Sequence, residues 1–301
     1  MINRDITVSI NDSKCIGCGL CVTVCPSETI SIKEGKAVIS GTMSIGCGHC
    51  AAICPEEAIS VAATNETLSL NTIEVDNKWM PPGEYNVEQL VRLMRSRRSC
   101  RNYKDKPVDR KILEDLIKIG ISAPSGSNCQ QWTFTIVPNR VALLKLGQLV
   151  VTYFKRLNLM ASQYILRKGL SWLGKHELEF YYQEYYEKIQ IAVQEFEESG
   201  KDRLFYGAPA AILVGSKPEA SCPAEDALLA TQNILLAAHA MGLGTCLIGF
   251  VVEALKRDPS IKKQLGLPLN ENIYSVIAVG YPNETYQRIA GRKRVEIRDA
   301  S

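Results

Sequence analysis

The sequence predicts a globular protein of two domains, and three observations support this prediction. The chain has 301 residues, more than one small domain usually contains. Seven of its eleven cysteines precede residue 55, whereas the other four are scattered singly. Between these regions, Pro81-Pro82-Gly83 continues neither a helix nor a central strand. We therefore expect a first domain over 1–75, a linker over 76–85 and a second domain over 86–301.

Composition and charge narrow the class of protein. Hydrophobic residues make up 46% of the chain and charged residues 22%, which is typical of a globular protein with a sizeable core. A formal net charge of +3 gives no reason to expect a nucleic-acid or membrane partner. The chain start has no secretory signal pattern, so we expect a cytoplasmic protein. The apolar stretch 227–252 contains polar residues and glycines, and we expect it to be a buried helix rather than a membrane span.

The first cysteine run has the spacing of an iron–sulfur ligand motif. It consists of Cys15, Cys18, Cys21 and Cys25, with Pro26 directly after it. This run resembles that of bacterial ferredoxins, in which three closely spaced thiolates hold one face of a [4Fe–4S] cube. Zinc is the alternative metal, but the fourth cysteine and the trailing proline favour a cluster.

A second run follows about thirty residues later, and the pair resembles a two-cluster ferredoxin. It contains Cys47, Cys50 and Cys54, again followed by proline, but Ser44 stands where the first cysteine would be. Each run precedes a β-rich segment. We expect a hairpin over 28–39 and a further strand over 58–61.

The resemblance implies that the fourth cysteine of each run binds the other cluster. The first cluster would then be held by Cys15, Cys18, Cys21 and Cys54. The second would be held by Cys47, Cys50 and Cys25, with Ser44 or solvent as the remaining ligand. An alkoxide is a harder ligand than a thiolate, so this cluster has either an altered four-iron form or a three-iron form. We expect two clusters.

The second domain begins with a capped helix and a basic segment. Asn86, with Gln89 three residues later, predicts a helix up to Arg95. The segment 97–103 then reads Arg-Arg-Ser-Cys-Arg-Asn-Tyr, which alone could be a solvated basic patch. A second helix over 109–120 leads to a loop that reads Ala-Pro-Ser-Gly-Ser-Asn-Cys-Gln-Gln-Trp.

These motifs resemble the nitroreductase superfamily of FMN enzymes, which carry Arg-Arg-Ser-x-Arg-x-Tyr/Phe and Ala-Pro-Ser-x-x-Asn-x-Gln-x-Trp. The resemblance runs from about residue 86 to the end of the chain. It implies a central mixed sheet flanked by helices, and a homodimer with two FMN sites at its interface. The fold class expected for the whole chain is therefore α+β, with a ferredoxin-like domain before a nitroreductase-type domain.

The same resemblance implies four groups of FMN contacts. The phosphate, ribityl chain and pyrimidine edge would be bound by Arg97, Arg98, Ser99 and Arg101. The flavin of the partner subunit would be reached by Pro124, Ser125, Asn128 and Gln130. Backbone groups near the reactive ring would come from Leu247, Ile248 and Gly249, in a glycine-rich loop. The phosphate would also be bound by Arg292 and Arg294, with Lys293 as an alternative and a solvated tail as the simpler interpretation.

Residues 150–206 are rich in aromatic side chains interleaved with charges. Most such aromatics belong to helix cores or dimer contacts. In the resembling enzymes the corresponding insertion covers the flavin and selects the substrate, so one or two of these rings would stack on a planar substrate. His176 and His239 have no partner motif, and we expect both to be structural.

The predicted function is an FMN-dependent reductase that receives electrons through its clusters from a ferredoxin or another low-potential donor. The expected acceptor is a small nitro, quinone, enone or halogenated aromatic compound. We assign no catalytic side chain, because the flavin carries the chemistry. The alternatives are a non-catalytic electron carrier or redox sensor, and a flavin-modifying enzyme.

Overall fold

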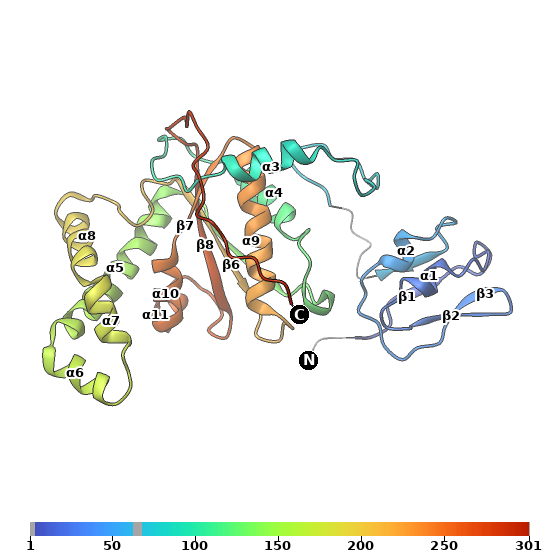
Figure 1. Cartoon of the computed structure of the whole chain (residues 1–301), viewed down its shortest axis with the longest axis horizontal. Coiled ribbons are helices and arrows are strands. Elements are labelled where there is room, and N and C mark those ends of the chain that lie inside the picture. The colour runs from blue at the N-terminus through green and yellow to red at the C-terminus, as the bar shows by residue number, and fades with distance from the viewer. Residues whose placement is uncertain (1–3, 63–67, 301) are drawn as a thin grey trace.

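The computed structural model describes residues 4–62 and 68–300. Residues 1–3, 63–67 and 301, which fall within the two expected domains, lie outside the described residues. Figure 1 shows a small N-terminal domain and a larger C-terminal domain side by side. None of the helices in the described part of the chain has both the length and the apolar character needed to span a bilayer.

The N-terminal domain, residues 4–62, is built from two small antiparallel sheets and two single-turn helices. Its elements are β1 (Val8–Ile10), α1 (Leu20–Thr23), β2 (Ile30–Lys33), β3 (Lys36–Ile39), α2 (His49–Ala52) and β4 (Ile59–Val61). Strands β2 and β3 pair as the expected hairpin. Strand β4 instead pairs with β1, which the sequence did not reveal because three residues are too short to show a period.

The C-terminal domain combines one sheet with many helices. Its helices are α3 (Val87–Ser96), α4 (Arg110–Gly120), α5 (Arg140–Ser162), α6 (Tyr164–Trp172), α7 (Glu177–Glu184), α8 (Tyr186–Ser199), α9 (Pro223–Ala240), α10 (Gly249–Arg257) and α11 (Pro259–Gln264), with a short 3₁₀ turn at Gly126–Asn128. Its strands are β5 (Trp132–Val137), β6 (Ala210–Ser216), β7 (Gly244–Leu247) and β8 (Asn272–Gly280). This arrangement confirms the α+β class.

The sheet has the strand order β5-β6-β8-β7, and each of its three strand pairings is antiparallel. The expectation of a mixed sheet is therefore wrong for the described residues. Parallel pairing is limited to an isolated bridge between Ser99 and Thr245. Helix α9 does return the chain parallel to β6, because β6 and β7 both run antiparallel to β8, but β8 lies between these two strands and separates them.

Helices cover both faces of the sheet, which explains why strand β6 is apolar from Ala210 to Gly215. Ala211 and Leu213 pack on one face, among residues of α5 and α10. Ala210, Ile212 and Val214 pack on the other face, among residues of α4 and α9. Since successive side chains of a strand point to opposite faces, a strand covered on both sides has no polar alternation. All residues of β6 are buried.

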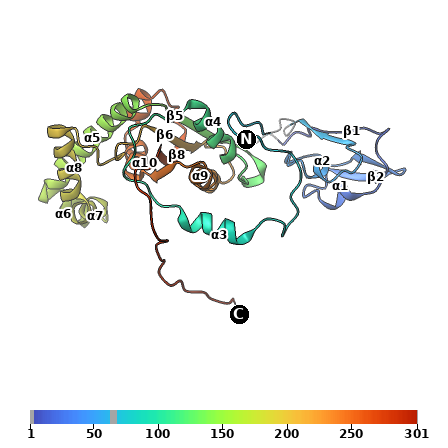
Figure 2. The same ribbon diagram turned by 90° about the horizontal axis from the view of Figure 1, so that it is seen from above.

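Helix α3 is capped as predicted but packs little. The Asn86 side chain accepts a hydrogen bond from the Gln89 backbone N–H at 2.9 Å. No residue of α3 is buried, and the apolar side chains of Val87, Val91 and Met94 are between 44% and 68% exposed. Figure 2 shows α3 and the C-terminal tail standing away from the body on the same side.

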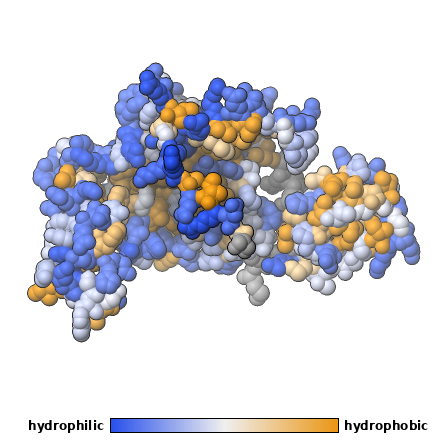
Figure 3. All heavy atoms as spheres, in the orientation of Figure 1, coloured by the Kyte–Doolittle hydropathy of each residue, from blue (hydrophilic) through white to orange (hydrophobic). Residues whose placement is uncertain are grey.

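Apolar side chains also gather on the visible face of the N-terminal domain (Figure 3).

A strap formed by residues 68–72 ties the segment after the N-terminal domain to helix α4. The buried Asp115 carboxylate accepts hydrogen bonds from the backbone N–H groups of Asn71 at 2.6 Å and Thr72 at 2.7 Å, and from the Thr72 hydroxyl at 2.6 Å. Lys118 donates to the Ser69 carbonyl at 2.7 Å. The strap thus lies on the C-terminal domain, while the expected domain boundary at residue 75 stays a prediction.

We expect Asp115→Asn to lower the free energy of unfolding by about 1–3 kcal/mol, because the amide leaves buried donors without an acceptor. Burial raises the pKa of Asp115, but the Asn71 and Thr72 hydrogen bonds outweigh it, so the pKa is lowered overall. A carboxylate whose pKa is lowered in the folded state contributes its full stabilisation at any pH above the unfolded pKa of about 4. This stabilisation is lost only as the pH falls through the folded-state pKa.

The difference between wild type and Asp115→Asn should therefore stay constant from pH 8 to pH 5. Thermal unfolding in that range, with the exposed Asp105→Asn as control, measures it. A difference that shrinks within this range would contradict the assigned contacts.

Candidate cofactor sites

The two cysteine runs of the N-terminal domain fold around two separate cavities. One cavity, called here the outer cavity, is lined by Cys15, Cys18, Cys21 and Cys54. The other, called the Ser44 cavity, is lined by Cys25, Cys47, Cys50 and Ser44. The structure therefore brings together both ligand sets implied by the ferredoxin resemblance, with the last cysteine of each run crossing to the other cavity.

Left-handed glycines make this wrapping possible. Gly17 and Gly19 in the first run have φ of 70° and 78°, and Gly46 and Gly48 in the second have φ of 59° and 76°. Glycine adopts these angles without the steric cost that a side chain brings. At Gly17 a Cβ atom would also lie 2.0 Å from the Gly35 carbonyl oxygen, at the tip of the β2-β3 hairpin. The repeated glycines thus belong to the ligand loops themselves.

Backbone N–H groups point at the sulfur atoms, as expected for thiolate ligands. Ala37 donates to Cys15 Sγ, Thr29 to Cys25 Sγ and Ala58 to Cys54 Sγ, each at 3.3 Å. The hydrogen bonds from Ala37 and Gly17 lower the pKa of the Cys15 thiol. Hydrogen bonds to cluster sulfurs stabilise the anionic form and tune the cluster potential.

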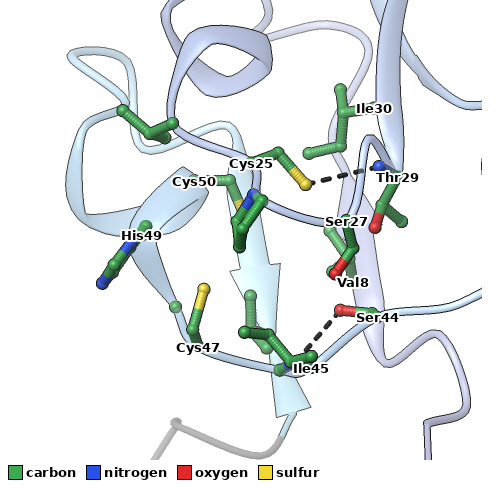
Figure 4. A pocket seen from close by; sticks show the side chains of 15 residues that line it. Val8, Cys25, Ser27, Thr29, Ile30, Ser44, Ile45, Cys47, His49 and Cys50 are labelled. Carbon is green, nitrogen blue, oxygen red and sulfur yellow. Dashed lines mark hydrogen bonds between the residues drawn. The ribbon is translucent and has the colours of Figure 1, made fainter. Parts of the chain in front are cut away.

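Ser44 occupies the position in its cavity that Cys15 occupies in the outer one. Its side chain is buried, and its Oγ accepts a hydrogen bond from the Gly46 backbone N–H at 3.1 Å, as Cys15 Sγ does from Gly17. The two cavities are nearly equal in volume, at about 20 Å³ each. Figure 4 shows Cys25, Cys47 and Ser44 around a common space, with the His49 ring pointing away. Ser44 as an iron ligand stays a prediction.

The donor chemistry fits a multi-atom cluster better than a single ion. Within the described ranges, no three histidine, cysteine, aspartate or glutamate side chains converge closely enough to hold one metal ion. The thiols are instead spread around the walls of a cavity. This spacing suits a cube of iron and sulfide, which carries its metals at its corners.

We expect Ser44→Cys to hold about eight irons per chain and to lose iron to a chelator more slowly than the wild type, because thiolate is the softer and stronger ligand. Anaerobic iron analysis and the rate of bleaching with a chelator measure both. The exposed Ser40→Cys is the matched control. Equal rates of iron loss in Ser44→Cys and the wild type would show that position 44 does not reach the iron.

A cluster of unpaired guanidinium groups lies where α3 ends beside strand β7. The pKa of Arg97 is lowered by burial and by the neighbouring positive charges of Arg98 and Arg292. In the described part of the chain none of these three arginines forms a salt bridge. Like charges held together without carboxylates form a site for an anion such as a phosphate, which guanidinium groups bind in a bidentate manner.

The remaining members of this set lie nearby or farther along the tail. Ser99 forms the backbone bridge to β7, and the Arg101 guanidinium lies over the Tyr206 ring at 5.7 Å from its centroid. Arg294 lies two residues beyond Arg292 in the exposed C-terminal tail. The positive charges that act on Arg97 are thus those of Arg98 and Arg292.

The predicted loop 124–130 lies at the opposite end of helix α9. There the Gly126 N–H donates to Asp226 Oδ1 at 2.8 Å, near the start of α9. Arg97 lies at the other end, near His239. Burial lowers the pKa of His239, and the positive charge of Arg97 lowers it further. Thirteen residues of helix separate Asp226 from His239, or about 20 Å at about 1.5 Å per residue. Within one chain, the two predicted halves of the flavin site are not brought together.

Loop 124–130 contacts the N-terminal domain, which the sequence did not predict. The Asn128 Nδ2 atom donates to the carbonyl oxygens of Ile45 at 3.1 Å and Gly46 at 3.0 Å. The Gln130 side chain donates to Asn128 Oδ1 at 3.1 Å, and the Ser125 hydroxyl accepts from the Gln130 backbone N–H at 3.0 Å. Pro124 and Gln130 are exposed. No short-range pattern marks a contact between segments more than eighty residues apart.

Residues 244–249 form a strand and a helix start instead of the expected glycine-rich loop. Residues Gly244–Leu247 are strand β7, because they pair with β8. The Ile248 N–H donates to the Val276 carbonyl at 2.8 Å, so this donor is not free to bind a flavin ring. Gly249 opens helix α10, and the first N–H groups of a helix have no partner inside it. Leu247 is half exposed.

The aromatic insertion forms the helices from the middle of α5 to α8. The Tyr181 ring stacks on Phe154, with 6.5 Å between ring centroids, and Tyr185 meets Phe250 edge to face at 6.1 Å. Trp172 and Phe180 are 89% and 57% exposed. Part of the aromatic set is therefore core, and part is free to meet another molecule.

The fold and the sites define a two-domain redox protein with an iron–sulfur module before an α+β reductase fold. The model of the nitroreductase family matches residues 94–281, and that of the 4Fe-4S dicluster domain matches residues 7–71. The chain belongs to the nitroreductase family and carries an N-terminal 4Fe-4S dicluster domain.

Several known proteins are similar to the C-terminal domain. Iodotyrosine deiodinase of Daphnia pulex is 26% identical over 65% of this chain, which spans 59% of that protein. The 4-nitrobenzoate reductase of a Nocardioides species is 25% identical over 65% of this chain and 81% of its own length. The structure of a Desulfitobacterium hafniense nitroreductase with bound FMN matches 68% of this chain and 97% of its own, with 24% identity and a TM-score of 0.49.

We expect Arg98→Ala to weaken binding of FMN by about 10–100-fold, because a hydrogen bond to a charged group contributes about 1.5–3 kcal/mol. Flavin fluorescence during titration of the apoprotein measures the affinity. Arg92→Ala, which removes an exposed arginine from the same region of the chain, is the control and should not change it. Unchanged affinity in Arg98→Ala would place the phosphate elsewhere.

Proposed function

We propose that this protein is an FMN-dependent reductase whose two iron–sulfur clusters supply electrons to its flavin. The observation that carries this proposal is the presence in one chain of two thiol-lined cavities and an unpaired guanidinium cluster. The first supports cluster binding by the N-terminal domain, and the second supports phosphate binding by the C-terminal domain. Family membership supports their combination in one reductase.

The proposed flavin site is shared between two copies of the chain. Arg97, Arg98 and Arg292 hold the phosphate from one copy. Loop 124–130 of the other copy meets the ring through Pro124, Ser125 and Gln130. The roughly 20 Å between these groups in one chain supports this division. The exposed apolar face of α3 and the exposed tail, in which Val295 and Ile297 are 78% and 86% exposed, supply surface for a homodimer interface.

The residues of the chain bind, orient and shield, while the cofactors supply the redox chemistry. When bound, FMN supplies two-electron hydride chemistry and each cluster supplies single electrons. The guanidinium cluster neutralises the phosphate and anchors one end of the flavin. The N–H groups that point at the thiol sulfurs stabilise the charged cluster ligands. A ferredoxin or another low-potential donor delivers the electrons.

The acceptor we propose is a small aromatic compound that carries a nitro group or a halogen, with quinones and enones as the wider class. The exposed rings of Trp172 and Phe180 in the insertion suit stacking on a planar substrate. Two similar proteins are named for a nitroaromatic and a halogenated aromatic substrate, and both share only part of their length with this chain.

Two other functions lead to different observations. A carrier or redox sensor would need no phosphate site, so the unpaired arginines favour the reductase. A flavin-modifying enzyme would consume its flavin with oxygen, whereas low-potential clusters favour an anaerobic reaction. Neither alternative explains both cofactor sites as well as electron supply to a flavin does.

Purified anaerobically, the protein should contain about one FMN and seven or eight irons per chain. Once reduced by a one-electron donor, it should convert a nitroaromatic or halogenated aromatic compound. An anaerobic visible spectrum with iron and flavin analysis tests the first part, and product analysis tests the second. Iron without flavin would leave a ferredoxin-like carrier, and the reductase proposal would be withdrawn.

A further inference from the structure

The side chain of Asn128 joins the two domains, because its amide group donates both of its hydrogens across the contact between them. Its Nδ2 group has two hydrogens, and both go to carbonyl oxygens of the N-terminal domain, those of Ile45 and Gly46. Its Oδ1 accepts from Gln130. The opposite orientation of the amide would bring its oxygen against two carbonyl oxygens, so the hydrogen-bond network fixes the assignment. Asn128 therefore has no hydrogen left to donate to a flavin.

The two carbonyls belong to the ligand loop of the Ser44 cavity. Ile45 and Gly46 lie between Ser44 and Cys47, and the N–H of Gly46 is the group that donates to Ser44 Oγ. Figures 1 and 2 both show α2, which follows this loop, on the side of the N-terminal domain that faces the C-terminal domain. Ile32 and Ala37 of the hairpin β2-β3, which lies on the far side in Figure 1, line the outer cavity, whereas Ile30 at the start of β2 lines the Ser44 cavity.

The backbone around Asn128 is held in an unusual conformation. Ser127, Asn128 and Gln130 have φ of 51°, 52° and 48°, in the left-handed region that non-glycine residues seldom adopt. Such strain persists only where surrounding contacts fix it, and it gathers at functional sites. Here the contacts are the hydrogen bonds to Ile45 and Gly46, together with Asp226 at Gly126. The loop thus presents the amide of Asn128 to the other domain at a conformational cost.

We propose that Asn128 is a positioning residue that fixes the Ser44–Cys47 ligand loop against the flavin loop 124–130. The Ser44 cavity is then the inner cluster site, next to the flavin, and the outer cavity is the entry site for electrons. Asp115 and its strap form a second tether that shortens the connection between the domains. The identity of the cofactors rests on the proposed function, whereas the clamp itself rests on the contacts of Asn128.

Electron balance constrains this arrangement. An external low-potential donor gives up two electrons, one at a time, to the outer site. They pass through the inner site to the flavin, which also takes up a proton from water to reach its reduced form. Because the inner site handles each electron in turn, a change in its distance from the flavin slows every turnover. The serine at the ligand position of this same site places the atypical cluster at the final step before the flavin.

The test compares Asn128→Asp and Asn128→Ala with Asn270→Asp in the full-length protein with its cofactors. Asn270 is exposed in the loop before β8, so its change is chemically matched and distant from the clamp. Hydrogen–deuterium exchange of residues 44–48 reports on the clamp without any turnover. Stopped-flow bleaching of the flavin by a reduced viologen reports on electrons that arrive through the clusters, and bleaching by borohydride reports on direct reduction.

We expect Asn128→Asp to speed exchange at 44–48 by about tenfold and to slow flavin bleaching by viologen by about 10–100-fold. Iron content, FMN content and bleaching by borohydride should equal those of Asn270→Asp. The alanine variant should behave in the same way but less strongly, because it removes the donors without adding a charge.

Unchanged exchange at 44–48 in both variants would overturn the clamp, as would loss of FMN with exchange unchanged, which would make Asn128 a flavin ligand. Faster exchange with an unchanged viologen rate would overturn the assignment of the Ser44 cavity as the inner site. If the wild-type protein holds no FMN, the proposed function fails, and the exchange result still decides whether Asn128 clamps the domains.

Discussion

The packing of helix α9 against the sheet is the constraint on which the arrangement of both cofactor sites depends. Its buried face, with Ala227, Ile234 and Ala238, lies in the core shared with α4, β6 and β8. Because this helix is rigid and 18 residues long, it sets the separation between the arginine cluster at one end and loop 124–130 at the other. We propose that the flavin is bound by one of these groups from each of two copies of the chain, and the length of the helix supports this proposal.

The end of α9 that carries loop 124–130 is also the end where the N-terminal domain attaches. Two sets of contacts join the N-terminal part of the chain to the C-terminal domain, the amide of Asn128 on the Ser44 loop and the carboxylate of Asp115 on residues 71–72. Both use buried or half-buried polar groups with their hydrogen-bonding capacity nearly filled, an arrangement that loses much of its stability when one partner is removed. An electron module held in this way has a fixed orientation, so its two cluster sites are not equivalent. In the arrangement proposed above, one is adjacent to the C-terminal domain and the other receives electrons from an external donor.

Much of the candidate site could be predicted because its elements are local. The spacing of Cys15, Cys18 and Cys21 is a ligand pattern in itself, and Asn86 and Asp109 cap their helices through contacts within three residues. Strands β1 and β7 could not be predicted in this way. Each exists only because a distant segment pairs with it, β4 in one case and β8 in the other. The mixed sheet inferred from family resemblance also gave way to antiparallel pairings that no local pattern encodes.

The sequence by itself determined which candidate ligands are present, namely seven thiols in two runs, a serine at one cysteine position and an arginine-rich segment after a capped helix. It could do so because ligand type and spacing are properties of adjacent residues. Only the tertiary structure decided how these groups are distributed in space. The sorting of the cysteines into two cavities, the opposite positions of the arginines and loop 124–130 on α9, and the contact of Asn128 with Ile45 all join residues far apart in the chain. These contacts are stabilised by packing and hydrogen bonds that form only on folding. For that reason they cannot be predicted from the pattern of adjacent residues.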